Sequence, residues 1–213
     1  MEAVKWEIII MSLNGRGQFL NQLLGQLSKQ IEGIAEVIIT VRYDGGPANA
    51  IGDRREIVRR ESTAEYINFV DDDDLVSPNY VSRILPLLDG VDYVGFDLAT
   101  FIDKESLGVT SHSLEYSGWK ELLTNKPPTY LRDISHLNPM RRELALQVPM
   151  SGGFGEDRRW ADGMRGRVKT EHFVREQLYY YLSRTKKNDA ADAHDPWRMR
   201  LLADLTPKTN QSL

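Results

Sequence analysis

EYINFVDDDDLVSPNY, residues 65–80, decides the fold, because four consecutive aspartates directly follow an apolar run that is typical of a strand. A sheet edge at this point would present the four carboxylates together. Adjacent carboxylates repel one another and are costly to bury, so a cation or a solvated turn must neutralise them. Carboxylate oxygens suit Mg²⁺ or Mn²⁺, and such ions keep open positions for nucleotide phosphates. The alternative is an exposed acidic turn that caps a helix beginning near Ser77 and Pro78.

Length and composition favour one globular domain, or one domain with a small appendage. The chain has 213 residues, of which 41% are apolar, enough to bury a real core. It has no cysteine, which excludes disulfides, a thiolate metal site and a cysteine nucleophile. The apolar run at residues 8–11 is shorter than a secretory signal, and no window approaches the ~20 apolar residues of a membrane span. We therefore expect a soluble, cytoplasmic protein without a transmembrane segment.

The charge is unevenly distributed along the chain. Residues 1–140 hold 13 basic and 21 acidic side chains, whereas residues 141–200 hold 13 basic and 9 acidic ones. The overall charge is −4. The basic C-terminal part is consistent either with a surface that faces a polyanion or with ordinary solvated helix faces, and both interpretations stay open.

Hydrophobic periodicity predicts alternating strands and helices in the first half of the chain. Strands are expected at residues 5–13, 36–41 and 66–70, and helices over residues 19–27, 51–62 and 80–88. Such alternation predicts parallel strands joined by right-handed crossovers, with ligands bound beyond the carboxyl ends of the strands. The polar clusters at residues 12–14, 44–46 and 71–74 each follow a predicted strand, so they should converge on one rim. The expected fold class is α/β, with a mixed, mainly parallel sheet flanked by helices.

The second half is expected to depart from this alternation. A strand at residues 91–102 leads into a turn-rich segment through Gly118 and residues 126–128, where we expect hairpins or a lid. Helices are predicted over residues 140–147, from 156 through 160, and over residues 171–182. After residue 188 the chain is polar and is expected to be loosely held. Four apolar residues in this tail could dock on the domain: Trp197, Met199, Leu201 and Leu202.

Three further features have both a chemical and a structural interpretation. The glycine-rich loop at residues 151–155 precedes Glu156 and Asp157, which places a carboxylate on mobile backbone as a general base or simply at a helix N-terminus. Asp44, beside two glycines, accepts hydrogen bonds from a ligand or sets an Asx-turn. Trp119 and Trp160 stack on sugar rings or pack in the core.

The chain resembles the nucleotide-sugar glycosyltransferases of the GT-A fold, and within them the inverting family 2. The segments that carry the resemblance, in order, are IIIMSLNGRGQFLNQLL, Asp44, GDRREIVRRESTAEYINFVDDDDLVSPNYV, GGFGEDRRWADG and YYYLSR, the last like the aromatic helix end of some small members. They span most of residues 6–184. The resemblance implies a GT-A (Rossmann-like) catalytic domain over residues 1–184, with a nucleotide-sugar half at 1–103 and an acceptor and base half at 104–184. Residues 185–213 would form a partly flexible tail.

The resemblance also implies roles for individual residues. Asp71 and Asp73 match the two ends of the DxD motif, so Asp73 would hold Mn²⁺ or Mg²⁺ and Asp71 the ribose or the metal. Asp157, with Glu156 beside it, matches the base that removes a proton from an acceptor hydroxyl. His194 is a candidate for completing the metal shell. Contacts with a UDP-sugar donor are assigned to Ser12, Asn14, Arg16, Asp44, Arg54, Arg55, Asp71 and Asp72.

Several alternatives stay open from the sequence. A nucleotidyltransferase acting on sugar phosphates also combines a nucleotide with Mg²⁺, but Gly15-Arg16-Gly17 is a poor substitute for its glycine-rich phosphate loop. A non-catalytic nucleotide-sugar-binding module is a third class. The acceptor hydroxyl could belong to a saccharide, a glycolipid, a protein side chain or a hydroxylated nucleic-acid base. The stretch at residues 12–14 stands where many relatives have an aromatic residue, which leaves the preference for uracil open.

Overall fold

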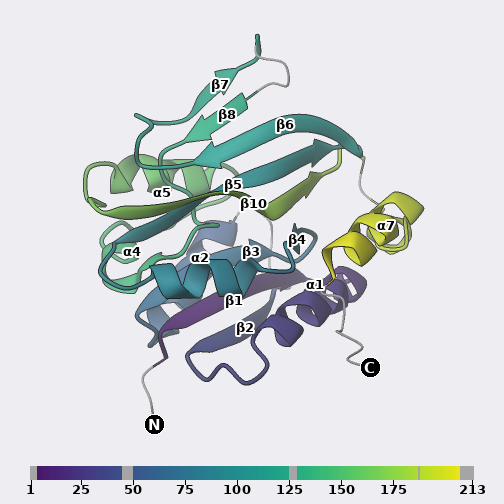
Figure 1. Ribbon diagram of the computed structural model, residues 1–213, viewed down its shortest axis with the longest axis horizontal. Helices are drawn as coiled ribbons and strands as arrows, with labels where there is room; N and C mark the ends of the chain where they lie inside the picture. The colour runs from purple at the N-terminus through teal and green to yellow at the C-terminus, as the bar shows by residue number, and fades with distance from the viewer. Residues whose placement is uncertain (1–3, 45–49, 125–128, 187, 207–213) are drawn as a thin grey trace, which may run out of the picture.

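The structure, a computed structural model, describes residues 4–44, 50–124, 129–186 and 188–206. Its strands and helices form a mixed sheet covered by helices (Figure 1). In chain order these elements are β1 (Trp6–Leu13), α1 (Gly17–Gln30), β2 (Val37–Asp44), α2 (Ile51–Glu61), β3 (Tyr66–Asp71), β4 (Leu75–Val76), α3 (Tyr80–Ile84), the 3₁₀ helix η2 (Leu85–Leu87), β5 (Tyr93–Ile102), β6 (Glu105–His112), β7 (Lys120–Leu122), β8 (Thr129–Arg132), β9 (Met140–Arg141), α4 (Arg142–Ala145), α5 (Glu156–Met164), β10 (Glu171–Ser183), α6 (Asp189–Asp192) and α7 (Pro196–Leu205).

The predicted parallel core is confirmed. Strand β1 pairs in parallel with both β2 and β3, and the strand order is β2-β1-β3-β9-β5-β6-β8-β7. Seven of the eight residues of β1 are buried, and successive side chains enter two different apolar cores. Ile8 and Ile10 pack with α1 and α3 on one side, whereas Ile9 packs with residues of α2 and α5 on the other. A strand buried on both faces explains its continuous apolar sequence.

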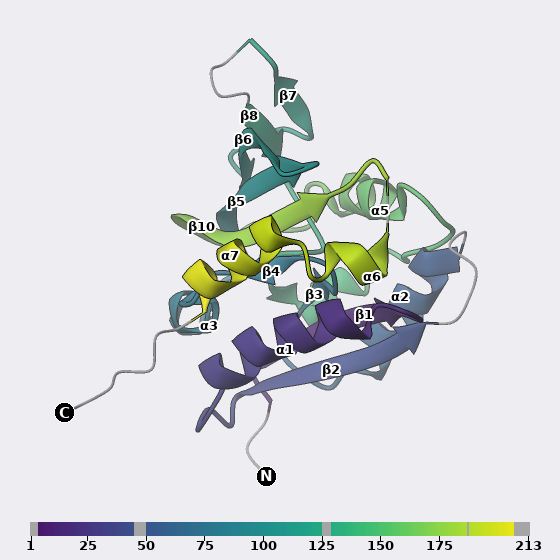
Figure 2. The same ribbon diagram turned by 90° about the vertical axis from the view of Figure 1, so that its right-hand side faces the viewer.

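The second half contains the expected hairpins. Strands β5 and β6 are antiparallel, and their turn uses Asp103 and Lys104 at positive φ angles of 49° and 75°. Strands β7 and β8 form a second antiparallel pair at the outer end of the sheet, as both views show (Figures 1 and 2). The chain then returns through β9, which pairs with β3 and β5 and so joins the two halves of the sheet.

The predicted helix over residues 171–182 is wrong, because this segment is the long strand β10, parallel to β5. The buried residues Val174, Leu178 and Leu182 are four apart, a spacing that suits one face of a helix and also one face of a strand. Pairing with β5 decides between the two, and the aromatic residues suit the strand. The YYYLSR segment therefore ends a strand rather than a helix.

Two other expectations need correction. The helix predicted over residues 140–147 is reduced to the one-turn helix α4, because Met140 and Arg141 pair with strand β3 instead. Residues 188–206 are held more firmly than predicted, with three of the four apolar residues that could dock packed on the domain. Helix α7 lies beside α1 in both views (Figures 1 and 2), and Trp197 packs edge-to-face on Phe101 with ring centroids 5.1 Å apart. Leu201 and Leu202 also pack there, whereas Met199 stays 41% exposed.

Within the described residues, no helix combines the length and the apolar character that crossing a membrane requires.

Candidate active site

The carboxyl ends of the three parallel strands converge on one rim, as predicted. Leu13 at the end of β1 is paired with Asp44 at the end of β2, and Met11 with Asp71 at the end of β3. The side chain of Asp44 and residues 45–49 lie outside the described part of the structure. The aspartate run at residues 71–74 therefore starts at the rim where a parallel α/β sheet binds its ligands.

Two of the four aspartates are internal to the protein. Asp72, only 1% exposed, accepts hydrogen bonds from Ser12 Oγ at 2.8 Å, the Leu13 backbone N–H at 3.3 Å and Arg16 Nη1 at 2.9 Å. Its carboxylate thus ties the turn after β3 to the loop after β1. In the structure, Ser12 and Asp72 bind each other, and Asn14 is exposed beside them.

Asp74 is held from the opposite side. The Tyr179 hydroxyl and the Leu182 backbone N–H both donate to its carboxylate at 2.7 Å. Burial, together with the charges of Asp73 and Asp71, raises the pKa of Asp74 well above its usual value. The Tyr179 hydroxyl also accepts from the Asp71 backbone N–H at 3.1 Å, so strand β10 fixes both ends of the acidic turn.

Asp71 and Asp73 alternate with these two and border a cavity of about 240 Å³. Arginines surround them: Arg55 Nη2 lies 2.7 Å from Asp71 Oδ1, while Asp73 pairs with Arg184 at 2.6 Å and with Arg16 at 3.3 Å. These ion pairs supply much of the neutralising charge that the acidic run needs. The run is therefore neither a solvated turn nor a set of four equivalent carboxylates.

Arg55 connects the acidic run to the second predicted motif. Its Nη1 lies 2.7 Å from Glu156 Oε1 while its Nη2 contacts Asp71, and both Arg55 and Glu156 are only 6% exposed. Helix α2 thus supplies one guanidinium that bridges the carboxylates of β3 and α5. Arg54, next to it, borders the larger neighbouring cavity.

Asp157 borders this larger cavity, which has a volume of about 590 Å³. Gly155, at a φ of 79°, ends the glycine-rich loop and starts helix α5, so Asp157 sits in the first turn of the helix. Its Oδ1 accepts only the adjacent Arg158 backbone N–H, at 2.7 Å, among the hydrogen bonds of the described residues. The two cavities share Asp71, Arg55 and Tyr181 in their walls, which places the predicted base and the acidic run on one continuous site.

A divalent metal suits the chemistry of Asp71 and Asp73. Burial raises the pKa of Asp71; Arg55 opposes this shift, and the neighbouring aspartates add to it. Such crowded negative charge is what a bound cation relieves. In the described part of the chain, no group of three or more His, Cys, Asp or Glu side chains is arranged to hold a metal alone. An ion bound here would complete its coordination shell with water or with oxygens of a substrate. His194 is exposed between α6 and α7.

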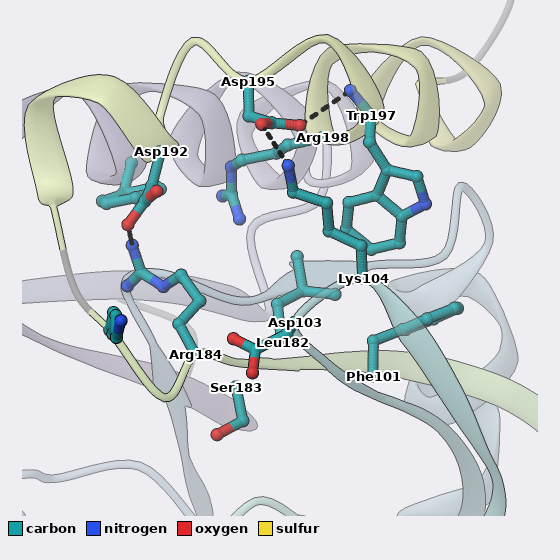
Figure 3. Close-up of a pocket in the computed structure, with 12 residues that line it drawn as sticks. Phe101, Asp103, Lys104, Leu182, Ser183, Arg184, Asp192, Asp195, Trp197 and Arg198 are labelled. Carbon is teal, nitrogen blue, oxygen red and sulfur yellow. Dashed lines mark hydrogen bonds and ion pairs between the residues drawn. The ribbon is translucent and has the colours of Figure 1, made fainter.

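The C-terminal segment contributes residues that the sequence did not single out. Arg184, at the end of β10, pairs with Asp73 and also with Asp192 at 2.8 Å. Arg198 of α7 donates to the Asp73 backbone carbonyl at 2.7 Å, and burial lowers its pKa to about 10. Figure 3 shows Arg184 reaching toward Asp192 and Arg198 projecting from α7, and both line an adjoining cavity of about 330 Å³. Both guanidinium groups stack on Phe19, at 4.7 and 4.5 Å from its ring.

The sequence held a signal for Arg184 but not for two other residues. Arg184 ends the quoted YYYLSR segment, whereas nothing marked Arg132 or His136, which also border the Asp157 cavity. Both ring nitrogens of His136 lack a hydrogen-bond partner among the described residues. Burial, with the nearby charges of Arg55 and Arg132, lowers the pKa of His136 well below its usual value, so it is neutral at physiological pH.

The fold is that of the GT-A glycosyltransferases, as the sequence resemblance predicted. S. aureus TarS, residues 1–349 in complex with UDP-GlcNAc, superposes with a TM-score of 0.62 and 13% identity over 88% of this chain and 61% of that chain. Glucosyl-3-phosphoglycerate synthase from Mycobacterium tuberculosis, in complex with Mn²⁺, UDP and glucosyl-3-phosphoglycerate, superposes with a TM-score of 0.53 and 15% identity. This match covers 98% of this chain and 83% of that chain.

These likenesses establish the fold alone, because the sequence identities are so low. The chain spans about three fifths of the TarS 1–349 structure. No protein-family profile matches the sequence, and no characterised protein sequence matches it either. The chemistry must therefore be argued from the site.

Proposed function

We propose that this protein is a metal-dependent, inverting glycosyltransferase that moves a sugar from a UDP-sugar to an acceptor hydroxyl. The observation that carries the proposal is the continuous site in which Asp71 and Asp73 stand at one end and Asp157 borders the adjoining cavity. The GT-A fold supports it, as do the UDP-GlcNAc complex of TarS and the UDP and Mn²⁺ complex of the mycobacterial synthase.

The acidic end of the site suits the nucleotide diphosphate. Asp73, with Asp71, would hold Mn²⁺ or Mg²⁺ there, and His194 remains a predicted further ligand. A bound ion of this kind supplies positive charge that stabilises the departing diphosphate. Arg55 and Arg16 keep the two carboxylates oriented by the ion pairs described above, and guanidinium groups are also good partners for phosphate oxygens.

Asp157 is the proposed general base, rather than its neighbour Glu156. The Glu156 carboxylate is buried against the Arg55 guanidinium, which holds it in place as a structural partner. Asp157 has no cationic side chain within ion-pair distance among the described residues, and it borders the larger cavity. It can therefore accept the proton of an acceptor hydroxyl that attacks the anomeric carbon from the face opposite the diphosphate, which inverts the configuration.

The test is the substitution Asp157→Asn, assayed with a panel of UDP-sugars and Mn²⁺ by measuring released UDP, with water or an added alcohol as acceptor. Removing a general base should slow UDP release by about 10²–10⁴-fold. UDP affinity, measured by calorimetry, should stay within about twofold because Asp157 does not line the cavity at the aspartate run. The matched control is Asp162→Asn, an exposed aspartate on the same helix that, among the described residues, forms an ion pair with Arg165 alone. Undiminished UDP release by the Asp157 variant would contradict the assignment.

A further inference from the structure

Three cavities adjoin one another along one side of the molecule. The cavity at the aspartate run shares Asp71 and Tyr181 with the Asp157 cavity, and the latter shares Trp119, Arg132 and Arg158 with a third cavity of about 340 Å³. The third cavity lies against strands β7 and β8, at the outer end of the sheet. If the nucleotide occupies the first cavity, the acceptor must reach Asp157 from the direction of the third.

Two arginines lie close to one tryptophan ring where the second and third cavities meet. The Arg132 guanidinium lies 4.1 Å from the Trp119 ring centre, and that of Arg158 lies 5.7 Å from it. Trp119 itself is anchored, because its indole N–H donates to the Ile134 carbonyl at 3.2 Å. The cations come from strand β8 and helix α5, so the fold, rather than local sequence, brings them together.

Neither guanidinium group is neutralised by a close carboxylate. Among the described residues, no acidic side chain lies within 4.0 Å of Arg132 or Arg158, and neither guanidinium donates a hydrogen bond. The nearest acidic influences on Arg132 are Asp157 and Glu121, and burial outweighs both, lowering its pKa. Arg132 is half-buried, whereas Arg158 is exposed. A half-buried arginine usually hydrogen-bonds to a carboxylate or a phosphate, so Arg132 has donors ready for an anion, and the exposed Arg158 beside the same tryptophan adds further donors.

We propose that this pair of arginines, both in contact with Trp119, is an acceptor subsite that binds a phosphate or carboxylate group carried by the acceptor. This inference rests on the proposed function and names the acceptor class: a small hydroxylated anion. Its charged group would accept hydrogen bonds from Arg132 and Arg158. Its hydroxyl would then extend toward Asp157, which directly precedes Arg158 in helix α5.

The experiment is isothermal titration of the full chain with three probes that share a hydroxylated skeleton: glycerol 3-phosphate, glycerate and glycerol. The phosphate or the carboxylate probe should bind, and the stronger of the two identifies the charged group. Glycerol should not bind measurably. The substitutions Arg132→Gln and Arg158→Gln should each weaken binding of the anionic probe by about tenfold or more, as expected for loss of a charge-assisted hydrogen bond.

The control is Arg200→Gln, which removes the same charge from an exposed arginine on α7. UDP binding with Mn²⁺ is measured on every variant and should not change, which separates this subsite from the donor site. Arg158 is exposed, so its variant carries the test if Arg132→Gln fails to fold. Equal binding of glycerol and both anions, unchanged affinity in both variants, or no binding of either anion would overturn the proposal. Anion binding that depends on these arginines in a protein that does not bind UDP would keep the subsite and contradict the donor assignment.

Discussion

Gly52 offers a sharp test of how the base-bearing loop is positioned. It is the second residue of α2, and its N–H donates to the Gly152 carbonyl at 2.8 Å. A Cβ at this position would lie 2.8 Å from the Gly152 oxygen and 2.8 Å from the Ser151 carbonyl carbon. Both are backbone atoms that cannot rotate away, so Gly52→Ala must displace the loop before Asp157 by about 0.5 Å to restore van der Waals separation.

The expected cost follows from this overlap. Overpacking of this kind destabilises a protein by about 1–3 kcal/mol, which urea unfolding would measure. Because the displaced loop leads into Asp157, UDP release should also fall by about tenfold or more, since small misplacements of a catalytic group are costly.

The matched control is Gly25→Ala in the middle of α1, where an added Cβ would meet no atom within 4 Å. This substitution should stabilise the protein by about 0.5–1 kcal/mol, because alanine favours helix over glycine. If Gly52→Ala proved as stable as the Gly25 variant, the close approach of α2 to the loop would be refuted.

Three further predictions concern other contacts. Tyr179→Phe removes the hydroxyl that donates to buried Asp74, and it should lower the free energy of unfolding, measured in urea, by about 1–3 kcal/mol. The control variant Tyr180→Phe should leave the free energy of unfolding unchanged. Burial lowers the pKa of His112 from 6.5 to about 3. The folded protein, which holds this imidazole neutral, therefore keeps its full stability above pH 6.5 and loses stability as the pH falls below 6.5. Protonation of His112 in the unfolded chain should make the free energy of unfolding about 2 kcal/mol lower at pH 5 than at pH 7. His112→Gln should remove this part of the pH dependence, and an unchanged pH dependence in the variant would contradict the prediction. Trp197→Ala should make the segment after residue 188 the first site of limited proteolysis, whereas unchanged protection would show that the contact with the β5–β6 hairpin does not hold α7.

The parallel core was predictable because its causes are local. Strand β1 contains the apolar run at residues 8–11, segments with helical periodicity separate it from the next strands, and chain order then fixes which strand ends converge. The position of the aspartate run at the rim followed from that rule, whereas the assignment of Asp157 to the same site rested on the family resemblance. The sequence did not predict which aspartates are buried and which border the cavity, because this depends on partners far away in the chain. Tyr179 donates a hydrogen bond to Asp74, and Ser12 donates one to Asp72.

Strand β10 shows the limit of periodicity. Val174, Leu178 and Leu182 fit a helix and a strand equally well, and only pairing with β5 and β4 resolves the ambiguity. The same limit applies to the Trp119 subsite. Its arginines come from β8 and α5, and their approach depends on the β7–β8 pair, whose contacts with the rest of the sheet are not encoded by any short motif.

The central claim is that the acidic run binds a nucleotide diphosphate through a divalent metal. The most direct measurement is calorimetric titration of UDP into the protein with Mn²⁺, with excess chelator, and with Mn²⁺ in the Asp73→Asn variant, using Asp162→Asn as the control. The account predicts UDP binding that needs Mn²⁺, falls by about tenfold or more in the Asp73 variant and is unchanged in the control. The account would be contradicted if UDP bound as tightly with chelator, and to the Asp73 variant, as it does to the unsubstituted protein with Mn²⁺. It would also be contradicted if UDP bound under none of these conditions.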